Sequence, residues 1–171
     1  LPEGEEWQFE PKWDGFRGIL ENLDGALHLW SRNGRPLLRY FPELVELGER
    51  LPKKSALDGE IVVEREGGLD FDALQMRLHP AESRIKTLAA LHPAIYIVFD
   101  VLVDDRGRPL VKLPLRERRR ALDAFAAKYF GDHDRIRLSP ATTDVDQAKK
   151  WLSGGGATLD GGSTVLLSLL N

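Results

Sequence analysis

The stretch Glu10-Pro11-Lys12-Trp13-Asp14-Gly15-Phe16-Arg17 decides how the rest of the chain is interpreted. If residues 7–13 form a strand, alternate side chains share a face, so Glu10, Lys12 and Asp14 lie together. Phe9, Pro11 and Trp13 then point the other way, towards a core. Gly15 then permits a sharp turn or a close backbone approach. Arg17 follows with a guanidinium suited to a phosphate or a carboxylate. The pattern predicts a lysine between two carboxylates and beside an anion-binding arginine, whereas a lone lysine is usually just a solvated strand end.

The run Lys12-x-Asp14-Gly15-x-Arg17 resembles the first motif of the covalent nucleotidyltransferases, which include ATP-dependent DNA ligases, RNA ligases and mRNA-capping guanylyltransferases. Its neighbourhood is most similar to bacterial ATP-dependent DNA ligases, including the end-joining type. The resemblance implies that Lys12 attacks the α-phosphate of ATP and becomes a lysyl-AMP. A lysine with the ordinary pKa of about 10.4 is protonated and not nucleophilic at neutral pH. We therefore expect burial or a nearby cation to favour the neutral amine.

Two apolar stretches carry further candidates. Glu60 lies in Asp-Gly-Glu-Ile-Val-Val, where a carboxylate is costly to bury unless it is paired, hydrogen-bonded or bound to metal. A structural ion pair is the ordinary alternative, but the stretch is similar to the third family motif, which implies a role in binding the ribose and the catalytic metal region. Phe99 lies in Ile-Tyr-Ile-Val-Phe-Asp-Val-Leu, where plain core packing is the simplest reading. Its resemblance to the next family motif implies that Phe99 stacks on the purine, a contact worth about 1–3 kcal/mol.

The resemblance assigns roles to four more residues. Glu10 corresponds to a position that contacts adenine, and Arg17 is expected to help bind ATP. Arg32, in Ser-Arg-Asn-Gly, matches an arginine that approaches the nucleotide sugar or the nick phosphate, although a solvated arginine beside a turn is commoner. The family uses Mg²⁺ to neutralise the departing pyrophosphate. Glu60 and Asp160 are the expected metal ligands.

The resemblance fails towards the end of the chain. Asp160 and Gly161 fit the start of the fourth motif, but its expected lysine is Val165, and the Lys-x-Lys strand of the fifth motif does not appear before Asn171. Those lysines would neutralise the α-phosphate, so transition-state stabilisation should fall. We expect residues 1–161 to be an incomplete adenylation domain and residues 162–171 an atypical, altered tail. We also expect this chain to lack the family's OB-fold domain and, since it starts at Leu1 with no initiator Met, to be a piece of a longer protein.

Hairpin, strand and helix signals alternate without a regular βαβ order. They predict an α+β fold with two mainly antiparallel sheets flanked by helices, in agreement with the resemblance. The expected strands are residues 7–13, 16–23, 26–31, 57–63, 94–103 and 136–138. The expected helices are residues 42–51, 71–78, 80–91, 114–130 and 144–152. Asp24-Gly25 is a two-residue hairpin signal, and Asp70 is an expected N-cap.

Composition sets limits on function. The 171 residues fit one domain, and 24 basic against 27 acidic residues give a net charge of −3, unlike an autonomous DNA-binding domain. The absence of cysteine excludes disulfides and thiol catalysis, and the four histidines lack zinc-ligand spacing. With no apolar run of about 20 residues and no signal peptide, a cytoplasmic monomer without membrane contact is the expectation. The basic run Arg116, Arg118, Arg119 and Arg120 is expected to be the exposed face of a helix and receives no site.

The intact protein is therefore expected to be an ATP-dependent DNA ligase that passes AMP to a DNA 5′-phosphate for nick sealing in repair or end joining. Its expected partners are nicked or broken double-stranded DNA and other end-joining proteins. The short chain by itself should bind ATP weakly and should not seal nicks. Two alternatives stay open: an RNA ligase or capping enzyme, and a degenerate nucleotide-binding domain without catalysis.

Overall fold

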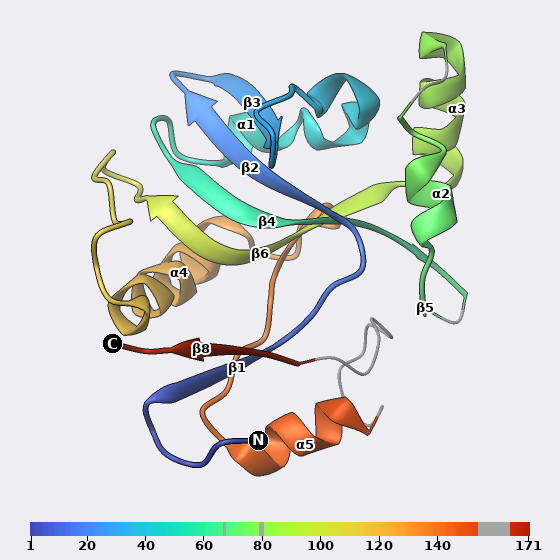
Figure 1. Cartoon of the computed structure of the whole chain (residues 1–171). Coiled ribbons are helices and arrows are strands. Elements are labelled where there is room, and N and C mark those ends of the chain that lie inside the picture. Colours follow the sequence, from blue (N-terminus) through green and yellow to red (C-terminus); the bar gives the residue numbers. More distant parts are fainter. Residues whose placement is uncertain (67, 79–80, 154–164) are drawn as a thin grey trace.

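Two β-sheets of unequal size, with helices packed around them, make up the computed structural model, which describes residues 1–66, 68–78, 81–153 and 165–171 (Figure 1). The larger sheet has the strand order β3-β2-β4-β6-β7, with β5 paired to β4. Its strands are β2 (Phe16–Leu23), β3 (Ala26–Ser31), β4 (Ala56–Arg65), β5 (Gly68–Leu69), β6 (Ala94–Val103) and β7 (Ile136–Leu138). The smaller sheet pairs β1 (Trp7–Pro11) with β8 (Val165–Leu169). All pairings are antiparallel except β6 with β7, which confirms the expected fold class.

The helical segments lie around these sheets, with α5 beside the small sheet and α2 and α3 at one end of the large sheet (Figure 1). They are η1 (Leu38–Tyr40), η2 (Pro42–Leu44), α1 (Leu47–Arg50), α2 (Phe71–Gln75), α3 (Glu82–Leu91), α4 (Leu115–Tyr129) and α5 (Val145–Leu152). The Asp70 carboxylate accepts a hydrogen bond from the backbone N–H of Ala73, as an N-cap does. Within the described residues, the helices are all too short or too polar to cross a membrane.

The single helix expected over residues 42–51 is wrong. The chain forms the 3₁₀ turn η2 and then the four-residue helix α1. Leu44 and Leu47 are both fully buried, and a spacing of three residues matches the period of a 3₁₀ turn. Gly48 lowers helix propensity further and lies against β3, where an added Cβ would come within 3.3 Å of Leu27 Cβ.

The hairpin between β2 and β3 forms as predicted. Asp24 and Gly25 both have positive φ angles, of 54° and 97°, as a type I′ turn requires. The side chain of Asn22 fixes this turn by accepting a hydrogen bond from the Gly25 N–H and donating to the carbonyl oxygens of Gly48 and Leu51. The hairpin therefore lies against α1 in a defined position.

The two faces of the large sheet have different characters because side chains alternate along each strand. On one face, Leu57 and Ile61 pack with Leu122 and Phe125 of α4 in the main core. On the other face, β4 carries Asp58 and Glu60. This polar face is the one that the functional argument concerns.

The apolar residues after the glycine-rich stretch form a strand that was not expected. β8 pairs with β1 from Trp7↔Leu169 to Pro11↔Val165. The backbone N–H of Leu170 donates to Glu6 O, and the N–H of Arg116 donates to Leu170 O. The end of the chain is thus tied both to the strand that precedes Lys12 and to the start of α4.

Candidate functional site

A cavity of about 580 Å³ lies between the two sheets, next to the end of β1. Its wall combines residues from both sheets and from the start of α4. The lining residues are Glu10, Pro11, Lys12, Trp13, Arg17, Glu60, Phe99, Asp100, Leu113, Pro114, Leu115, Arg118, Leu166, Ser168, Leu169 and Asn171. Five of the residues singled out from the sequence therefore line the same cavity: Glu10, Lys12, Arg17, Glu60 and Phe99. The structure brings them together from β1, β2, β4 and β6.

Lys12 follows β1 directly and is exposed on the cavity wall. Its neighbours Pro11 and Trp13 are buried, and the indole Nε1–H of Trp13 donates to Ser139 Oγ at 2.9 Å. The strand expected over residues 7–13 ends at Pro11, but the burial of the residues on either side of Lys12 follows the predicted alternation and fixes the backbone there. The folded chain does not bury the amine itself, so any desolvation of Lys12 has to come from a bound ligand or from a further part of the protein.

Gly15 brings the segment after Lys12 into close contact with β4. A Cβ added to Gly15 would lie 2.1 Å from the carbonyl oxygen of Ile61, so no larger residue fits there without movement. The backbone N–H of Gly15 also donates a hydrogen bond to the Glu60 carboxylate. Burial raises the pKa of Glu60 to about 7, while Arg17 and this hydrogen bond oppose the rise.

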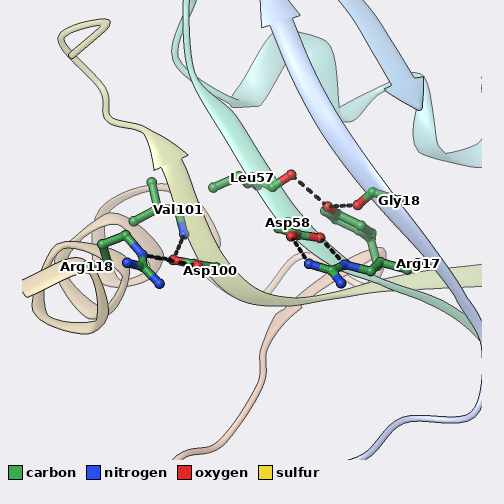
Figure 2. A network of polar contacts seen from close by, with 8 residues as sticks. Arg17, Gly18, Leu57, Asp58, Asp100, Val101 and Arg118 are labelled. Atoms are coloured by element: carbon green, nitrogen blue, oxygen red, sulfur yellow. Dashed lines mark hydrogen bonds and ion pairs between the residues drawn. The ribbon is translucent and has the colours of Figure 1, made fainter. Parts of the chain in front are cut away.

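Arg17 is held at the cavity by Asp58 (Figure 2). Its Nε and Nη2 donate to the two carboxylate oxygens of Asp58 at 3.1 and 2.7 Å, in a bidentate pair. The Asp58 side chain is 7% exposed and that of Arg17 is 55% exposed, so the arginine presents much of its surface to the cavity. The hydrogen bonds to Asp58 raise the pKa of Arg17, which keeps the guanidinium charged.

Phe99 sits at an irregularity in β6. Asp58 pairs with Asp100, but Gly59 pairs with Val98, so Phe99 is an extra residue without a partner on β4. Such a bulge changes the direction of a side chain, and here it accompanies the exposure of an aromatic ring at the cavity wall. The Arg17 guanidinium lies over this ring, with its Cζ 5.6 Å from the ring centroid.

Asp100 and Arg118 form a second ion pair on the cavity wall (Figure 2). Arg118 Nε donates to Asp100 at 3.0 and 3.2 Å, and the side chains of Arg118 and Asp100 are 19% and 18% exposed. Arg119 is also largely covered, with a side chain that is 13% exposed. The expectation that this basic run is only a solvated helix face is therefore wrong for Arg118 and Arg119. Arg118 contacts Asp100 and Arg119 contacts the carbonyl oxygen of Ser139, both far away in the sequence. A local sequence pattern does not predict such contacts.

Glu10 lies on β1, two residues before Lys12, and also lines the cavity. Burial raises the pKa of Glu10 to about 7, the charge of Arg119 lowers it, and Asp100 raises it. The Glu10 Oε1 atom is buried and has no hydrogen-bond partner among the residues that the structure describes. A buried, unsatisfied acceptor on a cavity wall is a feature that a bound polar group would satisfy.

One predicted site residue is not part of the cavity wall, and another cannot be placed. Arg32 is exposed in the turn after β3 and is not part of the cavity wall. Asp160 lies outside the described residues. Within the described ranges, no group of three or more His, Cys, Asp or Glu side chains is placed to hold a metal ion. Mg²⁺ is commonly bound by one or two carboxylates together with substrate phosphates, and Glu60 fits the part of such a single carboxylate ligand.

The chain resembles known DNA ligases over nearly its whole length. The family model described as "ATP dependent DNA ligase domain" matches residues 2–154. DNA ligase C of Mycobacterium tuberculosis is 47% identical over 160 residues, which cover 90% of this chain and 43% of that protein. The crystal structure of the ligase domain from M. tuberculosis LigD superposes with a TM-score of 0.61 at 28% identity, over 81% of this chain and 41% of that one.

A structure of a mycobacterial DNA ligase D complexed with ATP and MES superposes with a TM-score of 0.69, over 99% of this chain and 50% of that chain. At a sequence identity of 24%, this superposition shows a shared fold and nothing more. The chain spans less than half the length of DNA ligase C, so the activity of a whole protein is a separate question from the family of this domain.

Proposed function

This chain belongs to the family of ATP-dependent DNA ligase domains, and from that premise we propose that Lys12 is its nucleophile towards ATP. The observation that supports this most is the position of Lys12, which is exposed on the wall of the 580 Å³ cavity together with Glu10, Arg17, Glu60 and Phe99. A cavity of this size is in the range that holds small ligands and cofactors.

In the proposed reaction, Lys12 Nζ attacks the α-phosphorus of ATP. A bond forms between nitrogen and phosphorus, and the bond from the α-phosphorus to the oxygen that bridges to the β-phosphorus breaks. Pyrophosphate leaves, and the amine loses its proton to solvent. Arg17, charged and half-exposed beside Asp58, is the group on this wall suited to bind a phosphate oxygen during the transfer.

The remaining wall residues are proposed to orient the nucleoside. Glu10 accepts a hydrogen bond from the base, Glu60 binds the ribose, and the Phe99 ring stacks on the purine. Because Arg17 lies over the Phe99 ring, the purine must use the other ring face or displace the guanidinium. The bulge at Phe99 supports the stacking role, since an ordinary core residue would not need to leave the strand register.

Glu60 and Asp160 are the proposed protein ligands for Mg²⁺, which supplies charge neutralisation to the phosphates when it is bound. The raised pKa of Glu60, about 7, implies that a nearby cation would favour its ionised form.

We propose that the whole protein to which this domain belongs transfers AMP from Lys12 to a 5′-phosphate of nicked or broken double-stranded DNA. The similarity to DNA ligase C supports a DNA acceptor over an RNA acceptor. Arg32 in its exposed turn is proposed to contact the nick phosphate or the nucleotide sugar, in keeping with its position outside the cavity wall.

The proposal is tested by incubating the 171-residue chain with α-³²P-labelled ATP and Mg²⁺ and separating the protein under denaturing conditions. We expect a labelled band that is lost in acid, as a lysyl-AMP is. Lys12→Ala should abolish the label, and Lys53→Ala, which removes an exposed lysine away from the cavity wall, should keep it. Label that survives in Lys12→Ala would contradict the assignment.

A second candidate, nucleotide binding without catalysis, is favoured by one observation. Leu166, Ser168 and Leu169 of β8 line the cavity, and the sequence of this strand (VLLSL) contains no lysine to neutralise an α-phosphate. This reading predicts ATP binding that Arg17→Met weakens, with no covalent label on the chain. An extended chain that carries further lysines and becomes labelled would decide for the nucleophile proposal.

A further inference from the structure

The segment of residues 25–42 is basic in a chain that is acidic overall. It contains three arginines and one histidine but no Asp or Glu, whereas the whole chain has a net charge of −3. Two of these arginines, Arg32 and Arg35, lie in the turn that follows β3, and both are exposed. The ion pairs formed by the described residues all involve other basic side chains. Within the described part of the chain, the turn therefore presents two guanidinium groups that no carboxylate neutralises.

Hydrogen bonds fix the shape of this turn. The N–H of Ser31 donates to Arg35 O at 2.8 Å, and the N–H of Gly34 donates to Ser31 O at 2.9 Å. The N–H of Arg35 donates to Ser31 Oγ at 3.0 Å. Trp30 and Pro36 form an antiparallel bridge on either side of the turn. The Arg35 side chain therefore projects from a fixed backbone, which lowers the entropic cost of binding an anion there.

The turn lies close to the cavity that contains Lys12, on the outer side of Arg17. Ser31 pairs with Gly18 of β2, so the turn begins level with Arg17, and Arg17 in turn pairs with Glu60 of β4. β3 is the strand at the edge of the large sheet (Figure 1). Neighbouring strands are about 4.8 Å apart, so the backbone of the turn lies about 10 Å from that of Glu60. A guanidinium in the turn can thus reach an anion just outside the cavity.

The backbone of duplex DNA has a charge spacing that fits this position. Each strand carries one phosphate per about 3.4 Å of helix axis, so a distance of about 10 Å corresponds to about three nucleotides. If AMP passes from Lys12 to a 5′-phosphate at a nick, a backbone phosphate a few nucleotides away comes within range of the turn. A guanidinium suits such a phosphate because its N–H groups can donate to two phosphate oxygens at once.

We propose that Arg35 binds a backbone phosphate of the DNA duplex about three nucleotides away from the nick. The inference rests on the proposed function, since it takes nicked DNA as the acceptor of AMP. It goes further by assigning a DNA contact to a residue that is not on the cavity wall and that differs from Arg32. A phosphate contact carries no base specificity, so it should form on duplexes of any sequence.

The first test measures the dissociation constant of a nicked duplex by fluorescence anisotropy between about 50 and 200 mM salt, with the nick blocked by a dideoxy end. The variants are Arg35→Gln, Arg35→Lys as the charge-conserving rescue, and Arg106→Gln as a control on an exposed arginine in the turn after β6. We expect Arg35→Gln to raise the dissociation constant about three- to tenfold at the lowest salt and to reduce the slope of log affinity against log salt by about 0.9. Arg35→Lys should keep the slope, and Arg106→Gln should match the unchanged chain.

The second test locates the phosphate. A neutral methylphosphonate replaces single phosphates at successive positions on both sides of the nick. We expect the replacement about three nucleotides from the nick to weaken binding by the unchanged chain and to have little effect on binding by Arg35→Gln. Equal losses in the two proteins at every position would overturn the inference. An Arg35→Gln variant with the affinity and salt slope of the unchanged chain would overturn it as well.

Labelling by ATP separates this inference from the proposed function. A chain that forms a lysyl-AMP but does not bind the nicked duplex at low salt would overturn the inference and leave Lys12 as the nucleophile. A chain that binds the duplex through Arg35 but is not labelled would support the DNA contact and count against Lys12.

Discussion

Replacement of Gly15 by alanine tests whether the segment after Lys12 is fixed by close backbone packing. The added Cβ would lie 2.1 Å from Ile61 O, 2.9 Å from Val62 Cγ1 and 3.0 Å from Glu60 Cγ. The Ile61 carbonyl cannot move aside easily, because β4 is paired with β2 on one side and with β6 on the other. The segment that carries Lys12 must move instead, and Glu60 then loses the hydrogen bond from the Gly15 N–H.

The expected cost follows from the size of the clash. Overpacking a close-packed site typically lowers the free energy of unfolding by about 1–3 kcal/mol. For a chain of this length, 1 kcal/mol corresponds to about 2–4 °C in Tm, so Gly15→Ala should lower Tm by about 2–12 °C. Because a displacement of about 1 Å at a reacting group can cost about 100-fold in rate, covalent labelling by ATP should fall more steeply than stability.

The assay combines thermal unfolding followed by circular dichroism with the ATP-labelling rate at a temperature where both proteins are folded. Gly34→Asn is the matched control, since no atom lies within 4 Å of its added Cβ and asparagine tolerates the φ of +74° found there. That control should shift Tm by no more than about 2 °C. A Gly15→Ala variant with the Tm and labelling rate of the unchanged chain would refute the packing argument.

Three further predictions concern stability and pH. Tyr96→Phe removes a fully buried hydroxyl that donates to Gly18 O at 2.6 Å. The free energy of unfolding, measured by urea unfolding, should fall by about 1–3 kcal/mol. An unchanged free energy of unfolding would contradict this contact. Arg77→Met removes the guanidinium that lies 2.7 Å from the largely buried Glu43 carboxylate. The free energy of unfolding should fall by about 3–5 kcal/mol. The control Arg84→Met, at an exposed arginine, should lower it by less. Because the pKa values of Glu10 and Glu60 are raised to about 7, the folded chain holds more protons on them than the unfolded chain between about pH 4.5 and 7, and their contribution to the free energy of unfolding falls as the pH rises through that range. The double variant Glu10→Gln, Glu60→Gln should therefore lose less stability than the unchanged chain between pH 5 and 8, and equal slopes would contradict the raised pKa values.

The sequence predicts the parts of this structure that local patterns encode. Alternation places Phe9 and Trp13 in the interior and Lys12 on the surface, and Asp24-Gly25 forces the positive φ angles of the hairpin. The apolar runs around Glu60 and Phe99 become central strands of the large sheet. Five of the candidate site residues that the resemblance singles out line the same cavity in the structure.

Contacts between distant segments are not predictable in this way. The Phe99 bulge depends on the register of β6 against β4, which periodicity alone does not fix. Arg118 meets a carboxylate 18 residues away, and Arg119 meets a carbonyl 20 residues away, so a helix-face pattern cannot show that they are covered. The strand β8 has five residues, four of them apolar, and only its pairing with β1 shows where it belongs.

The most direct test of the central claim is to locate the covalent adduct. The chain is incubated with ATP and Mg²⁺, digested without acid, and analysed by tandem mass spectrometry. The account predicts one AMP attached to Lys12, within the cavity that also contains Glu60 and Phe99. AMP on a different residue, or bound ATP with an unmodified Lys12 in an extended chain of the same protein, would contradict it.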